Sequence, residues 1–493
     1  MAQTDITQEK IDEFNVKPSD IVFLTGSGIS LDSGLPDWAT FVKNLLIESK
    51  TMESDDLAEL FVRRQSNLLV IADGAHQSAK SNNLEWKQVA LKGLYGTGVN
   101  EKPASQMHEI VARYQFEFSC PVLTTNFDVL HEIAGLKHLE HLVENGWNPD
   151  EDADPDEFIP KSHDEDRHDD EGRIVVSHLH GVLDPRPDGL ISEEKSLIIG
   201  QSDYNNLFKK DISWQSEVID DSVRRHKTFV VLGHSLNDQD IQNWFHRRSE
   251  DNFTVYFFVV RESLGVDKET FGRLFDPIKQ QWSSINVKTI MIDDYVDANQ
   301  ILLEIYYMNK ERSNNRYNPP ATRISCLYSK IENDTRKASE DTLMWIESLE
   351  KPCDANIDDF DVSVWIADGK GSIHRFSSLN RIFLKIDPLK FIETGFDSEY
   401  LAGRAICSNS VMLEDGSDGK WNTIMARSFS CEFADGPELS IGVVTVAVKF
   451  KDQSSDSSLE QRVYILEQLR VYIDTLREIL SCEFSRLVSS LAE

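Results

Sequence analysis

A glycine-rich turn directly after an apolar run is the first segment whose residues could do chemistry. Residues 21–25 suit a short buried strand, and Gly26, Gly28 and Gly34 follow before a helical pattern resumes. Glycine lets the backbone approach phosphate oxygens closely, and peptide N–H groups near a helix start point at the anion. The segment is therefore typical of the place where an α/β sheet receives a dinucleotide pyrophosphate. The spacing is not that of an ordinary dehydrogenase, because Leu31 stands where G-x-G-x-x-G has its third glycine.

Three further polar segments follow apolar runs along the chain. They are residues 124–128 (Thr-Thr-Asn-Phe-Asp), 178–181 (His-Leu-His-Gly) and 233–238 (Gly-His-Ser-Leu-Asn-Asp). Each is predicted to lie at the carboxyl end of a strand, where open α/β sheets bind their ligands. We therefore expect these segments and the glycine turn to surround one cavity.

Together the four segments resemble the sirtuin (Sir2) family, and they follow the family order over residues 18–245. The glycine turn is similar to the family's GAGIS…SGIPDF loop. The later segments are similar to its T-Q-N-x-D, x-L-H-G and G-x-S motifs. The resemblance implies an enzyme that binds NAD as its substrate and breaks the bond between nicotinamide and ribose.

The resemblance also implies roles for individual residues. Asn126 corresponds to the family asparagine that orients the ribose or the attacking water, and His180 corresponds to its general base. An imidazole suits a general base because its unperturbed pKa lies close to working pH. Both side chains are expected to converge on the ribose carbon, where positive charge develops as the bond breaks.

Further residues are expected to contact NAD or to shape its cleft. Asp37 resembles the aspartate beside the nicotinamide pocket, and Asp128 could hold Asn126 or serve only as a loop anchor. His131, His178 and His234 match no catalytic role and are expected to be structural or cleft-lining. The residues expected to bind the cofactor are Gly26, Ser27, Gly28, Ile29, Ser30, Asp37, Trp38, Thr125, Asp128, Gly233, Ser235 and Asn237.

Two departures from the family pattern bear on the reaction. The six cysteines include no C-x-x-C pair, and none lies between residues 121 and 325, where sirtuins carry a zinc ribbon. Trp38 and Ala39 stand where sirtuins have phenylalanine and arginine. We therefore expect no metal and no protein deacylation, with water or a hydroxyl of NAD itself as the acceptor.

Alternating strand and helix patterns over residues 18–310 predict an α/β fold with a doubly wound parallel sheet of the Rossmann or sirtuin type. Residues 1–17 suit a polar helical lead-in, and residues 39–118 suit a helical subdomain over the cleft. Strands at 255–260 and 289–292 and a helix at 298–310 are expected to close this domain, which spans residues 1–310. Residues 150–172 are densely acidic and predict a solvated loop, with a lid or a docking element as the alternative.

A polar segment with two prolines, residues 311–322, predicts a linker to a second domain at 323–493. That α+β domain is expected to contain a helix at 324–349 and strands at 362–367, 404–413, 423–433 and 440–450, with Leu401–Ala405 at a turn and strand. A last helix is expected at 459–480. This order resembles a GAF-type sensor domain. The apolar stripe of the last helix would seat it on its sheet or pair it with a second subunit, so a homo-oligomer is expected.

Composition limits the partners. The chain has 493 residues, which predicts two or more domains, and a formal net charge of −33, which disfavours sequence-independent nucleic-acid binding. No run suits a membrane span or a signal peptide, so a cytoplasmic location is expected.

Zinc-less Sir2-like domains fused to a second domain are similar to bacterial anti-phage effectors that destroy NAD once triggered. The leading hypothesis is therefore an NAD hydrolase that is held off at rest and activated by a nucleotide signal or a partner protein. The alternatives are a non-catalytic NAD or ADP-ribose-binding regulator and an NAD-dependent deacylase or ADP-ribosyltransferase. The sequence leaves open the trigger, the subunit number, the role of residues 150–172 and the ligand of the C-terminal domain.

Overall fold

The computed structural model describes most of the chain. The described residues are 11, 14, 16–64, 67–96, 102–147, 155–165, 173–186, 197–210, 212–234, 239–248, 253–282, 286–292, 295–310, 317–350, 357–386, 390–395, 398–408, 410–415, 420–451 and 457–489. Among these residues, no helix combines the length and the apolar character that crossing a bilayer requires. Most of the predicted helical lead-in at 1–17 lies outside the described residues.

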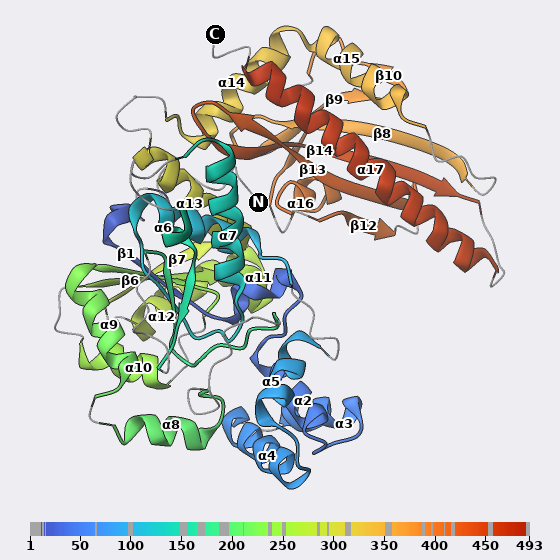
Figure 1. The fold of residues 1–493 in the computed structure, drawn as a ribbon. Coiled ribbons are helices and arrows are strands. Elements are labelled where there is room, and N and C mark those ends of the chain that lie inside the picture. The colour runs from blue at the N-terminus through green and yellow to red at the C-terminus, as the bar shows by residue number, and fades with distance from the viewer. Residues whose placement is uncertain are drawn as a thin grey trace. The chain divides into compact units, whose positions relative to one another are not determined.

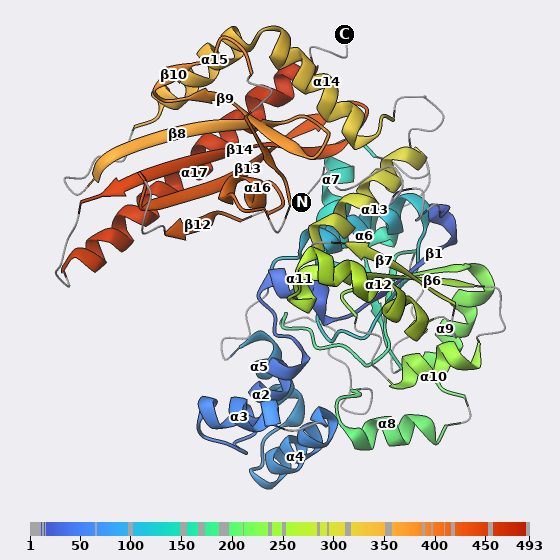
Figure 2. The ribbon, with the colours of Figure 1, turned by 180° about the vertical axis from the view of Figure 1, so that it is seen from behind.

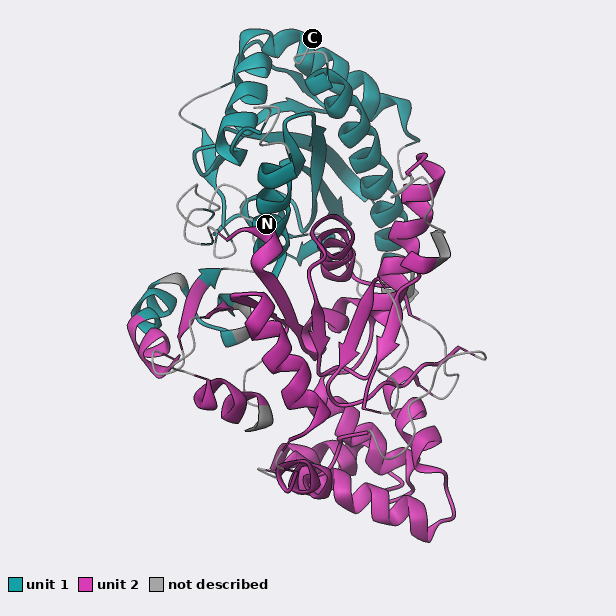
Figure 3. Cartoon of the chain, turned by 60° about the vertical axis from the view of Figure 1, so that its left-hand side comes forward, with its two compact units in different colours: residues 1–15, 259–275, 291–493 teal, residues 16–258, 276–290 magenta. Residues whose placement is uncertain are grey.

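The chain forms two compact units (Figure 3). One contains residues 16–258 and 276–290, and the other contains residues 1–15, 259–275 and 291–493. Residues 311–316 of the predicted linker lie outside the described residues, and helix α14 begins at Pro320. The domain boundaries at 310 and 323 stay a prediction.

A seven-stranded sheet organises the first part of the chain (Figures 1 and 2). Its strands in spatial order are β3 (Lys161–His163), β4 (Val175–His178), β2 (Val122–Thr124), β1 (Ile21–Thr25), β5 (Thr228–Leu232), β6 (Thr254–Val260) and β7 (Val287–Ile292). The pairs from β3 through β6 are parallel. The chain runs from β1 to β2 on one side and later returns to β5 on the other side. The carboxyl ends of β1 and β5 therefore border the topological switch point, where such sheets bind ligands.

Helices cover both faces of this sheet. Val22 and Leu24 belong to a core with α9 (Trp214–Arg225), α10 (Gln239–Arg247) and α12 (Lys268–Trp282). Phe23 points to the other face, where its ring lies 5.3 Å from that of Tyr114 in α6. Because side chains alternate across a strand, burial on both faces requires the unbroken apolar run of β1. The predicted doubly wound parallel α/β fold is confirmed.

The predicted helical subdomain is also present. It consists of α2 (Trp38–Glu48), α3 (Asp55–Arg64), α4 (Leu68–Ser81), α5 (Trp86–Tyr95) and α6 (Gln106–Phe118). Asp37 starts α2 as its N-cap, because its carboxylate accepts a hydrogen bond from the Thr40 N–H at 2.7 Å. Phe41, Val42 and Leu45 recur at helical spacing and are buried.

The prediction of a plain loop at 150–172 is wrong for its described middle part. Residues 155–158 form the 3-10 helix Pro155–Phe158, and β3 (Lys161–His163) adds an edge strand parallel to β4. Backbone pairing at a sheet edge needs no apolar period, so composition did not reveal it. Ser162 of β3 donates a hydrogen bond to Glu132 on α7 (Leu130–Glu144), which explains a polar residue on a buried strand position.

The other unit contains an antiparallel sheet. Its order is β10 (Arg381–Ile382), β9 (Ser372–Ser378), β8 (Ile357–Ala367), β14 (Gly436–Phe450), β13 (Thr423–Phe433) and β12 (Met412–Asp415), and β11 (Phe391–Glu393) also pairs with β9. Helix α17 (Ser457–Ser489) contributes Leu469, Ile473, Leu476 and Leu480 to the core of this unit. The apolar stripe therefore seats α17 on its own sheet.

Two predictions for this unit are wrong. The helix expected at 324–349 is two helices, α14 (Pro320–Asn333) and α15 (Thr335–Ser348), with Asp334 between them. The strand expected at 404–413 is the short helix α16 (Leu401–Ala405) followed by β12. A Cβ on Gly403 would lie 2.4 Å from the Glu393 carbonyl oxygen, so α16 packs closely against the residues around β11 at this position. The strands expected at 362–367, 423–433 and 440–450 are confirmed.

Candidate active site

The turns that follow β1 and β5 touch each other through their backbones, and the contact leaves no room for a side chain at Gly26, Gly28 or Gly233. The Gly26 N–H donates to the Leu232 carbonyl at 3.0 Å, and the Gly28 N–H donates to the Gly233 carbonyl at 2.8 Å. A Cβ on Gly28 would lie 2.8 Å from the Gly233 Cα. Gly233 itself has a φ of 60°, which favours glycine. Gly26 and Gly28 are predicted from the sequence to let the backbone approach phosphate, and the structure shows that they also allow this contact between the two strand ends.

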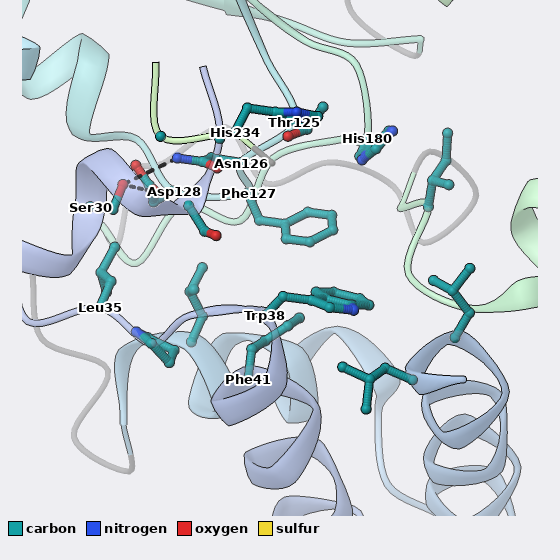
Figure 4. A pocket seen from close by; sticks show the side chains of 18 of the residues that line it. Ser30, Leu35, Trp38, Phe41, Thr125, Asn126, Phe127, Asp128, His180 and His234 are labelled. Carbon is teal, nitrogen blue, oxygen red and sulfur yellow. Dashed lines mark hydrogen bonds between the residues drawn. The ribbon is translucent and has the colours of Figure 1, made fainter. Parts of the chain in front are cut away.

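A cavity of about 500 Å³ opens beside this contact (Figure 4). Its volume lies within the range of small-molecule sites, roughly 300–1,000 Å³. The lining residues are Gly26, Ser27, Ser30, Leu35, Pro36, Trp38, Phe41, Asn67, Leu68, Leu69, Leu94, Thr125, Asn126, Phe127, Asp128, His180, Ile198, Tyr204, Gly233 and His234. Polar groups from the strand ends thus share one cavity with apolar side chains from the helical subdomain.

Most of the predicted site residues line this cavity, and a few do not. The predicted residues in the lining are Gly26, Ser27, Ser30, Trp38, Thr125, Asn126, Asp128, His180 and Gly233. Gly28 and Ile29 belong to the same turn but are not part of the lining. The exposed Asp37 is also outside the lining and caps α2. Ser235 and Asn237 lie outside the described residues. His234, expected to be structural or cleft-lining, is part of the lining.

Hydrogen bonds fix the orientation of the Asn126 amide. The Ser30 hydroxyl donates to Asp128 Oδ2 at 2.9 Å and accepts from Asn126 Nδ2 at 3.1 Å. Since an ionised carboxylate only accepts, the hydroxyl proton is directed to Asp128, and the amide must present its NH₂ to Ser30. The carbonyl Oδ1 of Asn126 is therefore not the atom that contacts Ser30. Burial raises the pKa of the Asp128 carboxyl, while hydrogen bonds from Leu130 and Ser30 oppose that shift.

His180 lies on the other side of the cavity from Ser30. In Figure 4 the Asn126 amide points toward Ser30, and the His180 ring lies apart from it, beyond Thr125. His180 is buried, and its ring meets Tyr204 of α8 (Gln201–Phe208) edge to face with centroids 5.5 Å apart. The two predicted catalytic side chains therefore line one cavity without pointing at each other.

Residues 121–290 match the model of the SIR2-like domain. The match includes the strand ends that carry Asn126, His180 and Gly233, and it begins after the glycine turn. No curated protein matches the chain. A solved structure described as "Structural Basis for the Mechanism and Regulation of Sir2 Enzymes" is 14% identical, covers 62% of this chain and 100% of that chain, and has a TM-score of 0.32. A Sir2 homologue mutant in complex with ADP-ribose is 12% identical, covers 63% of this chain and 99% of that chain, and has the same TM-score of 0.32.

Tyr95 of α5 ties the helical subdomain to two loops of the segment that matches the SIR2-like model. Its hydroxyl donates to the Leu183 carbonyl at 3.0 Å and accepts from the Val129 N–H at 3.4 Å. Burial raises the pKa of the Tyr95 phenol, so the hydroxyl keeps its proton at neutral pH. This one residue therefore fixes the loops that follow Asn126 and His180. No motif in the sequence indicated it.

An aromatic wall from α2 faces the polar strand ends. The ring of Phe41 lies 5.8 Å from that of Trp38 and 5.8 Å from that of Phe127. The sequence places Phe41 in a helical pattern, but a periodic pattern does not tell a cavity wall from a core. Apolar residues of α4 and α5 complete this side of the cavity.

The described part of the chain offers no cluster of metal ligands. No group of three or more His, Cys, Asp or Glu side chains among these residues could hold a metal ion. Five described cysteines are free thiols, of which Cys120, Cys407 and Cys431 are buried.

Proposed function

We propose that this protein hydrolyses NAD to nicotinamide and ADP-ribose. The observation that supports it most is the cavity at the switch point of the parallel sheet, where Asn126, Asp128 and His180 line the same space as the glycine turn. Asn126 and His180 both lie in the segment that matches the SIR2-like domain. NAD would place its pyrophosphate against the glycine turn, and the aromatic wall would contact a ring of the nucleotide.

The proposed reaction takes place at the ribose C1′ of NAD, in two steps. The bond between the ribose C1′ and the pyridinium nitrogen breaks, and its electron pair returns to the nicotinamide ring. The Asn126 Oδ1 dipole faces the positive charge that develops on the ribose. A water oxygen then bonds to C1′, and His180 accepts the proton of that water. General-base assistance of this kind typically contributes ~10²–10⁴-fold to the rate.

Hydrolysis is preferred to deacylation for a reason in the sequence. The segment between residues 121 and 325 contains no cysteine, so the thiolate ligands of a family-type zinc ribbon are missing there. Transfer of ADP-ribose to another acceptor stays the less favoured enzymatic alternative. A non-catalytic NAD or ADP-ribose-binding regulator is the main competing function, and the hydrogen bond from Asn126 to Ser30 favours it, because the amide is turned away from His180.

The C-terminal sheet would hold the enzyme off until a signal arrives. We propose a GAF-like sensor of a nucleotide signal or a partner protein, in a homo-oligomeric cytoplasmic enzyme of the kind that defends bacteria against phage. Constitutive NAD loss would kill the cell, so an enzyme of this type needs such a control. NAD is then both substrate and the only cofactor that the proposal requires.

Nicotinamide release from NAD by the purified chain tests the proposal. The assay is run alone and with candidate nucleotides and partner proteins, and the product is followed by chromatography. Asn126→Ala and His180→Ala are each expected to lower release by at least about 10²-fold. Asn206→Ala and His141→Ala, at exposed positions outside the cavity lining, are matched controls expected to keep full activity. Release that persists in both cavity variants would reject the site, and tight NAD binding without release under every activator would favour the regulator.

A further inference from the structure

A buried histidine–glutamate pair lies at the carboxyl end of β4, two residues before His180. His178 is fully buried, and Glu132 on α7 is 2% exposed. The His178 Nε2 lies 2.8 Å from Glu132 Oε1. Neither residue lines the cavity, and neither has a part in the proposed reaction.

The second ring nitrogen of His178 reaches the backbone of Asn126. Its Nδ1 lies 2.9 Å from the Asn126 carbonyl oxygen. A carbonyl oxygen and a carboxylate both accept hydrogen bonds, so the imidazole satisfies both only when each nitrogen carries a proton. Burial lowers the pKa of His178, but the charge and hydrogen bond of Glu132 raise it more, and the net shift is upward. The geometry thus favours an imidazolium held between the two acceptors.

Glu132 is itself held in place from a third element. Ser162 of β3 donates a hydrogen bond to the same carboxylate oxygen that His178 contacts. Burial raises the pKa of Glu132, whereas the positive charge of His178 and the two hydrogen bonds lower it, and the net shift is downward. A chain of contacts therefore runs from the edge strand through Glu132 and His178 to the peptide that carries Asn126.

Other hydrogen bonds also hold this loop, among them that from the Asn126 N–H to Thr124 Oγ1 at 3.0 Å. The Leu179 N–H donates to the Thr124 carbonyl at 2.8 Å, and the Leu183 N–H donates to the Phe127 carbonyl at 2.7 Å. These bonds flank Asn126 without touching its own carbonyl. His178 supplies that contact, so the direction of the peptide between Asn126 and Phe127 depends on it.

We infer that His178 and Glu132 are a positioning pair that holds the peptide of Asn126 and thereby sets where its side chain stands at the cavity, while Ser30 sets which way the amide is turned. The inference rests on the proposed hydrolysis for its kinetic consequence. A misplacement of about 1 Å at a reacting centre can cost ~10²-fold in rate. Loss of the pair should therefore lower kcat, with little effect on KM, because the cavity walls that would bind NAD stay in place.

Two substitutions at one position separate positioning from mere structure. In His178→Asn the side-chain amide NH₂ takes the place of Nδ1 and can still donate to the Asn126 carbonyl. In His178→Gln the longer side chain takes the place of Nε2 and reaches Glu132 instead. We expect kcat for nicotinamide release within about threefold of wild type in His178→Asn and roughly 10²-fold lower in His178→Gln, with KM for NAD unchanged in both. Equal kcat values in the two variants, high or low, would overturn the inference.

Amide hydrogen exchange over residues 124–130 gives a readout that does not need activity. Exchange should be faster than wild type in His178→Gln and unchanged in His178→Asn, and the reverse order would also overturn the inference. If wild type releases no nicotinamide with any activator, the hydrolase proposal fails, while exchange still decides whether His178 sets the Asn126 loop. If His178→Gln does not fold, Glu132→Met, which keeps the volume and removes the acceptor, carries the same comparison with His178→Asn, with kcat expected to fall by up to ~10²-fold.

Discussion

The two sheets of this protein hold their polar side chains in different places. β1 is apolar from Ile21 to Leu24, and polar residues begin at Thr25, its last residue, and continue into the turn beyond its carboxyl end. β8 instead alternates, with Asp361 and Ser363 on either side of the core residue Val362. A parallel sheet that is buried on both faces gathers its polar groups at one edge, whereas an antiparallel sheet with one core face spreads them over the other face. The candidate chemistry therefore concentrates in the unit that contains the parallel sheet.

The largest effect is expected where the parallel sheet packs most tightly. Gly233→Ala would force a Cβ to within 2.4 Å of the Ile29 backbone nitrogen, at a φ of 60°. We expect the free energy of unfolding to fall by roughly 3–5 kcal/mol and NAD binding to be lost. Urea unfolding and calorimetric titration with NAD measure the two effects.

Gly34→Ala is the matched control for that substitution. Gly34 also has a positive φ, of 75°, but apart from its own chain neighbours no described residue has an atom within 4 Å of the position that an added methyl group would take. Gly34→Ala should lower the free energy of unfolding only by the backbone strain of a positive φ, about 1–2 kcal/mol, and should retain NAD binding. Equal costs for the two glycines would mean that the contact between β1 and β5 is not what requires glycine.

One fully buried leucine in each unit allows the cores of the two units to be compared. Leu45 of α2 packs in the core of the helical subdomain with Phe41, and Leu476 of α17 packs in the core under the antiparallel sheet. Each change to alanine should destabilise its own unit by about 2–5 kcal/mol. Only Leu45→Ala should also raise KM for NAD, because α2 carries the aromatic wall. Thermal unfolding and steady-state kinetics check this, and a KM shift of the same size in Leu476→Ala would contradict it.

The ion pair of His178 and Glu132 predicts a pH dependence of stability. The raised pKa of His178 gives a stabilisation that is complete below its unfolded value, near 6.5, and is lost as pH rises through the folded value. The lowered pKa of Glu132 gives a stabilisation that is present above its unfolded value and is lost as pH falls through the folded value. Unfolding free energies from pH 4 to pH 9 should therefore fall on both sides, by at most about 1.4 kcal/mol per pH unit for each group. His178→Asn should flatten the alkaline side, and an unchanged slope there would argue against an ion pair.

The smallest effect is expected at Asp37. Asp37→Ala removes the N-cap of α2 and should lower the free energy of unfolding by about 1 kcal/mol, without a change in KM for NAD. Denaturant titration and kinetics separate the two quantities. A large rise in KM would restore the sequence prediction that Asp37 contacts the cofactor.

The sequence was most informative where local pattern and tertiary structure agree. The apolar runs of β1, β2, β4 and β5 predicted the sheet, and the polar residues after them predicted most of one face of the cavity. It was least informative where the structure depends on long-range pairing. The edge strand β3 pairs through its backbone inside an acidic segment, and Gly403 of α16 packs against Glu393 and Ser398, which local pattern does not show.

Side chains that act through other side chains could not be predicted at all. The orientation of Asn126 follows from Ser30, which lies 96 residues earlier in the chain. His178 was expected to be structural or cleft-lining, and Tyr95 and Tyr204 carried no signal, because tyrosines near the ends of helices are common in cores. Motifs predict the residues that contact a ligand, but they do not predict the residues that orient those side chains.

The contact between Gly28 and Gly233 also bears on how the protein is made. One wall of the cavity comes from the first strand and the other from a segment translated some 200 residues later, so an incomplete chain on the ribosome has no closed pocket. If the proposed hydrolysis is correct, a nascent chain would spare the NAD of the cell that synthesises it until β5 has emerged and joined the sheet.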